Sequence, residues 1–131
     1  FANLGVGIVT NMFLGCTALK KPPFLNWQTS GSYSAAGMFT NCFSLINTPS
    51  YNFQYITNFA AAFTNCYNLT SISQLNLTNV TSASNAFFNC SSLTTVPSIN
   101  LPAATAADNF FNGCKSSKSN FTTRGVRTPR S

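Results

Sequence analysis

The sequence contains no histidine, and Asp108 is its one acidic residue. General acid–base catalysis commonly uses a pair of carboxyl groups or a histidine, and a catalytic triad needs a histidine beside its nucleophile. A zinc site is not indicated either, because no two cysteines form a Cys-x-x-Cys pair. We therefore expect a non-enzymatic protein without catalytic, cofactor-binding or metal-binding residues.

Charged side chains are scarce as well. They make up 6% of the 131 residues, and none lies between positions 22 and 107. Soluble domains have about a quarter charged residues, and free cytosolic proteins usually depend on net charge for solubility. Here Asn, Thr, Ser and Gln supply the polar surface. We expect an extracellular, cell-surface or virus-particle location, or a subunit whose sides are covered by neighbours.

No run of about 18 apolar residues is present, so we expect no transmembrane helix. The sequence starts at Phe1, and no basic segment followed by an apolar one indicates a signal peptide. These features are typical of a processed product or of part of a larger chain or assembly.

What the sequence does contain is a repeated motif, in which a Phe stands three residues before a Cys. The pairs are Phe13/Cys16, Phe39/Cys42, Phe63/Cys66, Phe87/Cys90 and Phe111/Cys114, which include all five cysteines. Subtracting the cysteine numbers gives steps of 26, 24, 24 and 24 residues, a period typical of solenoids. We predict a repeat domain over 1–116, with units at 13–38, 39–62, 63–86 and 87–110 and partial units at both ends. Residues 117–131 are predicted to form a basic tail or loose cap.

Each unit contains one short segment with the alternation of a half-buried strand. Asn stands ten residues after the cysteine between two apolar residues, as in Ile99-Asn100-Leu101. We predict strands near 24–27, 50–53, 74–77 and 98–101, with the asparagines facing outward.

The other half of each unit has apolar residues three and four apart, as on one face of a helix. Residues 78–90 show this spacing at Val80, Ala83, Ala86, Phe87 and Cys90, and residues 55–66 repeat it. We predict a short helix here, with the Phe and Cys of the motif in the structural core. The predicted fold is an α/β solenoid: a right-handed leucine-rich-repeat coil with one short strand and one short helix per repeat, and about four full repeats.

The motif resembles that of the BspA-like leucine-rich repeat family. The resemblance rests on Met12-Phe13-Leu14-Gly15-Cys16-Thr17-Ala18-Leu19, on the apolar-Asn-apolar segments and on Asn79-Val80-Thr81, and it covers about residues 6–116. It implies a surface protein of bacteria, some protists or phage particles that serves adhesion or host contact and has no catalytic residues.

The row of asparagines on the predicted strands has two interpretations. Stacked Asn side chains can form a structural hydrogen-bond ladder along a sheet, which is the commoner case. Alternatively, the face binds a protein or a glycan. The candidate partner-binding residues are Asn26, Ser50, Asn52, Gln74, Asn76, Ser98 and Asn100.

The cysteines are favoured as small buried apolar residues over disulfide partners, because five cannot all pair and each occupies the same position in its repeat. Five Asn-x-Ser/Thr sequons, at Asn68, Asn76, Asn79, Asn89 and Asn120, are attributed to the Asn- and Thr-rich composition.

The C-terminal segment holds five of the seven basic residues, namely Lys115, Lys118, Arg124, Arg127 and Arg130. Such a cluster can attract an anionic partner. Nucleic acid is not favoured, because Phe121 is the one aromatic residue among these side chains. A solubilising tail or a segment that docks on another subunit is favoured.

Two functions are carried forward. The first is a non-enzymatic module for adhesion or for recognition of a host-surface protein or glycan. The alternative is a structural subunit or decoration protein of an extracellular assembly, such as a phage virion or appendage. Ice binding is a weaker third option, because the sequence lacks a regular Thr-x-Thr row.

Overall fold

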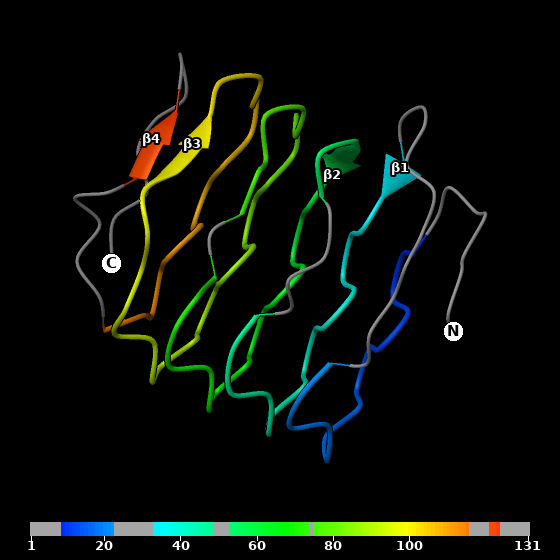
Figure 1. Ribbon diagram of the computed structural model, residues 1–131, viewed down its shortest axis with the longest axis vertical. Helices are drawn as coiled ribbons and strands as arrows, with labels where there is room; N and C mark the ends of the chain where they lie inside the picture. Colours follow the sequence, from blue (N-terminus) through cyan, green and yellow to red (C-terminus); the bar gives the residue numbers. More distant parts are fainter. Residues whose placement is uncertain (1–8, 23–32, 49–52, 74, 116–120, 124–131) are drawn as a thin grey trace.

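The computed structural model describes residues 9–22, 33–48, 53–73, 75–115 and 121–123. The chain makes successive turns that lie side by side, and we call each turn, one repeat long, a rung (Figure 1). Four short strands lie in these rungs: β1 (Tyr33–Ser34), β2 (Ile56–Asn58), β3 (Ile99–Leu101) and β4 (Phe121–Thr123).

All strand pairing among the described residues is parallel, as expected when equivalent positions of successive rungs lie beside one another. β1 pairs with β2, and β3 pairs with β4, in two separate two-stranded sheets. Single bridges extend this pairing along the stack, in one column at Asn58–Ser82–Ala106 and in another at Asn47–Ser71–Thr95.

The described residues contain no helix, so the predicted α/β solenoid with a helix in every repeat is wrong. Where the helices were expected, the chain forms five turn segments, at 9–16, 35–42, 59–66, 83–90 and 107–114. In these segments, backbone N–H groups donate alternately to a carbonyl of the next rung and to a carbonyl of the same turn. Phe39 N donates to Ala62 O of the next rung at 2.8 Å, whereas Met38 N closes a local turn on Ala35 O at 3.2 Å. The backbone of the turn segments is thus hydrogen-bonded mainly between rungs and not along a helix.

Positive backbone φ angles explain why no helix forms. In every turn segment two residues, four apart, have a left-handed conformation, which a run of right-handed helix cannot contain. These pairs are Asn11/Gly15, Gly37/Asn41, Ala61/Asn65, Asn85/Asn89 and Asn109/Gly113. Nine of these ten residues are Asn or Gly, the residue types that adopt this conformation most easily.

The predicted strands are matched in part. Segment 98–101 overlaps β3, whose residues are buried, exposed and buried in turn. Leu75, Asn76 and Leu77 show the same alternation, but they are not in a strand. The predicted strand at 24–27, most of that at 50–53, and residue 74 lie outside the described residues.

The turn segments point their apolar residues into one continuous core. Phe39, Phe63, Phe87 and Phe111 have no exposed surface. The motif rings stack along the rungs, with centroids 5.1 Å apart for Phe13–Phe39, Phe39–Phe63 and Phe63–Phe87, and 5.8 Å for Phe87–Phe111. The spacing of three and four residues thus identifies an inward face, although the backbone that presents it is not helical.

Candidate functional site

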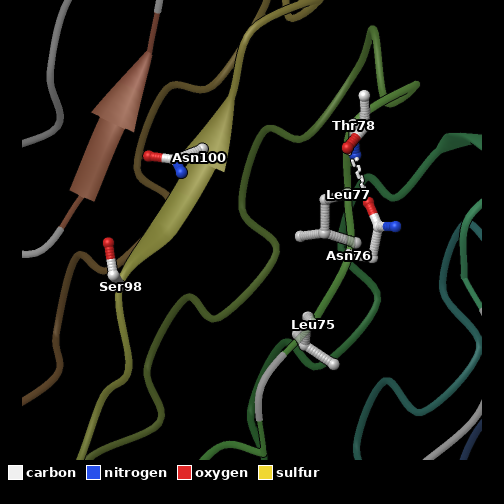
Figure 2. A pocket seen from close by; sticks show the side chains of 6 residues that line it. All are labelled: Leu75, Asn76, Leu77, Thr78, Ser98 and Asn100. Atoms are coloured by element: carbon white, nitrogen blue, oxygen red, sulfur yellow. Dashed lines mark hydrogen bonds between the residues drawn. The ribbon is translucent and has the colours of Figure 1, made fainter.

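A pocket of about 410 Å³ lies on the face where the strands were predicted, between segment 75–78 of one rung and segment 98–100 of the next (Figure 2). We call it the strand-face pocket. The two rungs are bridged on either side of it, at Ser71–Thr95 and at Ser82–Ala106. The pocket therefore opens in the part of the face between two points of backbone pairing.

Among the described residues, the lining of the pocket is mostly polar and carries no ionisable group. It consists of Leu75, Asn76, Leu77, Thr78, Ser98 and Asn100. The two leucines are almost fully buried, whereas the polar residues are exposed. Such a lining can hold an uncharged ligand by hydrogen bonds and apolar contact, but it has no group suited to proton transfer.

One polar residue of the pocket is held in place by a local turn. The Asn76 Oδ1 accepts hydrogen bonds from the Thr78 hydroxyl at 2.6 Å and from the Thr78 N–H at 3.2 Å. This Asx turn orients the carboxamide at the rim of the pocket (Figure 2).

The structure brings three of the seven predicted partner-binding residues together in this pocket, namely Asn76, Ser98 and Asn100. Asn26, Ser50, Asn52 and Gln74 lie outside the described residues. Sequence reasoning missed Thr78, although the sequon Asn76-Leu77-Thr78 already placed its hydroxyl near Asn76.

An asparagine ladder does exist, but in another column of the stack. Asn65 Nδ2 donates to Asn41 Oδ1 at 2.9 Å, and Asn89 Nδ2 donates to Asn65 Oδ1 at 3.4 Å. These residues directly precede the motif cysteines and have positive φ. The ladder is therefore part of the turn segments and not of the pocket.

The five cysteines are free thiols, and four of them are buried. Each buried thiol donates to the carbonyl of the motif Phe in the preceding rung, for example Cys66 Sγ to Phe39 O at 3.2 Å. Burial raises the pKa of Cys42 from 9.0 to about 12. Hydrogen bonding to the thiols of Cys114 and Cys66, together with burial, raises the pKa of Cys90. These protonated thiols are poor nucleophiles, and they serve the packing of the rungs.

A family profile described as "Mycoplasma protein of unknown function, DUF285" matches residues 5–124. The chain belongs to the DUF285 family. No curated protein and no solved structure matched the chain. Both the turn segments and the strand-face pocket of this DUF285 protein lie inside the matched region.

Outside the pocket, this DUF285 protein exposes several large apolar side chains. They are Leu14, Phe43, Ile46 and Tyr67, with 36–49% of their surface accessible. The rings of Phe43 and Tyr67 stack with centroids 5.1 Å apart and planes 11° apart. This exposed pair stacks between two neighbouring rungs, as the motif rings do inside the core.

The predicted basic tail of this DUF285 protein is described in part. Lys115 is exposed, whereas Lys118, Arg124, Arg127 and Arg130 lie outside the described residues. β4, which lies between Lys118 and Arg124 in the sequence, pairs in parallel with β3, from Ile99–Phe121 to Leu101–Thr123. Within the part of the chain that the structure describes, no helix is long and apolar enough to cross a membrane, and no group of three potential metal-ligating His, Cys, Asp or Glu residues is present.

Proposed function

We propose that this DUF285 protein is a non-enzymatic surface module that recognises a partner through the face that carries the strand-face pocket. The observation behind this proposal is the uncharged pocket of about 410 Å³ between two rungs, in which Asn76, Ser98 and Asn100 surround two buried leucines. Its volume lies within the usual range of about 300–1,000 Å³ for small-ligand sites. A glycan or an uncharged loop of a protein fits this chemistry.

The repeats support the same proposal. A Phe-x-x-Cys motif at intervals of 24 to 26 residues resembles that of the BspA-like leucine-rich repeats, which implies adhesion or host contact at a cell or particle surface. We assign the repeats to this BspA-like type and the protein to an extracellular setting. The absence of charged residues between positions 22 and 107 favours a partner that is bound without ion pairs.

The test is binding of the purified chain to immobilised glycans and to cells at two salt concentrations. Asn100→Ala removes an exposed amide from the pocket and is expected to weaken binding at least about tenfold, the effect of ~1.4 kcal/mol. Asn47→Ala is the matched control, because Asn47 is an exposed asparagine in a different column of the stack. Equal binding by both variants and the wild type excludes the pocket as the contact surface. Strong salt dependence contradicts recognition by an uncharged face.

A structural subunit of an extracellular assembly is the second candidate, and the exposed apolar side chains favour it. Phe43, Ile46 and Tyr67 lie on the surface of a chain that has few charges to keep it soluble. In such an assembly a neighbouring subunit covers these residues. Light scattering after size exclusion separates the two functions, because a stable soluble monomer at high concentration is expected of a recognition module and not of an obligate subunit.

A further inference from the structure

The five sequons of the chain are not equivalent in the structure. Three of them have a side-chain nitrogen that is committed to a neighbouring rung. Asn68 Nδ2 donates to Phe43 O at 2.8 Å, Asn79 Nδ2 to Gln54 O at 2.7 Å, and Asn89 Nδ2 to Asn65 Oδ1 at 3.4 Å. This hydrogen bond holds each of the three carboxamides against the adjacent rung, and it must break before a transferase can enclose the side chain. Asn120 lies outside the described residues.

Asn76 is the exception among the sequon asparagines that the structure describes. Its Oδ1 is bonded to Thr78, and its Nδ2 has no hydrogen-bond partner among the described residues. Figure 2 shows this nitrogen pointing away from Thr78, and the residue is exposed.

The hydroxyl of the sequon threonine also distinguishes the Asn76 sequon from the Asn79 sequon. Thr78 donates its hydroxyl to the carboxamide of Asn76. In the Asn79 sequon, Thr81 donates its hydroxyl to Thr57 O in the neighbouring rung at 3.1 Å. Asn76-Leu77-Thr78 is thus a self-contained turn whose acceptor nitrogen faces outward.

We propose that Asn76 is an acceptor site for an N-linked glycan. The donor class is a sugar activated as a diphosphate ester. Asn76 Nδ2 forms a bond to the anomeric carbon, the bond from that carbon to the diphosphate oxygen breaks, and the diphosphate leaves with the electron pair. The proton lost from Nδ2 passes to a base of the transferase.

In the experiment, the folded 131-residue chain is incubated with a single-subunit oligosaccharyltransferase that recognises Asn-x-Thr and with a lipid-diphosphate-linked oligosaccharide. Intact-mass and glycopeptide analysis then locate the sugar. We expect modification mainly at Asn76, its loss in Asn76→Gln and in Thr78→Val, and its retention in Asn79→Gln. Circular dichroism of each variant confirms that the fold is kept.

The urea-unfolded chain, treated in parallel after dilution, is the control for the enzyme, and it is expected to accept sugar at several sequons. Equal modification of Asn68, Asn79 and Asn76 in the folded chain overturns the proposal. So does an unmodified Asn76 in the folded chain when the unfolded chain is modified. The inference does not rest on the proposed partner, because the mass of the product measures the modification and Asn100→Ala tests partner binding separately.

Discussion

Asn65 donates its side-chain nitrogen to Oδ1 of Asn41, one rung away, at 2.9 Å, and both residues have a positive φ, 63° and 64°. Asn65 also accepts a hydrogen bond from Asn89 Nδ2. One residue type thus meets two requirements of the turn segment: a left-handed backbone and a side chain that links three rungs.

These two requirements can be separated by substitution. Asn65→Gly keeps the backbone conformation but removes two hydrogen bonds, so we expect a loss of about 1–2 kcal/mol in the free energy of unfolding. Asn65→Ala keeps a Cβ in the left-handed region without the polar side chain that lets Asn tolerate it, which adds about 1–2 kcal/mol. Urea denaturation of both variants measures the difference. Equal losses would mean that the positive φ is not a constraint at this position.

The stacked rings of the core are expected to dominate stability. Phe63 has no exposed surface, and it stacks with Phe39 and Phe87 at 5.1 Å. Phe63→Ala should therefore cost about 3–5 kcal/mol on chemical denaturation. Tyr67→Ala is the matched control, since Tyr67 stacks with Phe43 at the same distance but is 42% exposed. Its truncation is expected to cost about 1 kcal/mol, the value of an exposed aromatic pair. A loss below about 1 kcal/mol for Phe63→Ala contradicts its place in the core.

The inward face of the turn segments could be predicted from the sequence, but their backbone could not. Val80, Ala83, Ala86, Phe87 and Cys90 are all fully buried, in agreement with the helical spacing. A series of turns with a left-handed residue at every fourth position points its side chains inward at the same spacing as a helix does. Periodicity alone therefore does not distinguish such turns from a helix. The distinguishing signal was the Asn or Gly that recurs four residues apart, as at Asn85 and Asn89. Ala61 has a positive φ without any such signal.

The candidate site was also predictable in part. Alternation of apolar and polar residues identified Asn76, Ser98 and Asn100 as outward-facing residues. The pocket between them could not be predicted, because it depends on where neighbouring rungs pair and where they separate. The choice of Asn76 among five sequons likewise depends on hydrogen bonds to rungs that are 24–25 residues away in sequence.

The buried thiols predict a loss of stability at alkaline pH. The pKa of Cys42 is raised from 9.0 to about 12 by burial, so the folded state keeps a proton that the unfolded state releases. This contribution is fully present below about pH 9 and is lost as the pH rises toward 12. Between about pH 5 and 8 stability should be nearly constant, because the chain has no histidine and one acidic residue. Denaturation under reducing conditions from pH 5 to 11 measures both effects.

Cys42→Ala supplies the control for this pH dependence. The alanine variant should be less stable at pH 7, and it should lose less of its remaining stability between about pH 9 and 11. Part of the alkaline loss should persist, because the pKa of Cys90 is raised as well. An unchanged alkaline slope in the variant would assign the effect to other groups.

Two glycines at the same position of the repeat should respond differently to alanine. Gly15 and Gly113 each precede a motif cysteine and have φ of 74° and 86°. A Cβ on Gly15 meets no atom within 4 Å, so Gly15→Ala should cost only the left-handed strain of about 1–2 kcal/mol. A Cβ on Gly113 lies 3.1 Å from Cα and 3.2 Å from N of Asn89, and the backbone of that residue cannot move aside as a flexible side chain can. We therefore expect Gly113→Ala to cost a further ~1–3 kcal/mol, as overpacking does. The two urea midpoints provide the test, and equal midpoints would show that the last rung is not packed against Asn89.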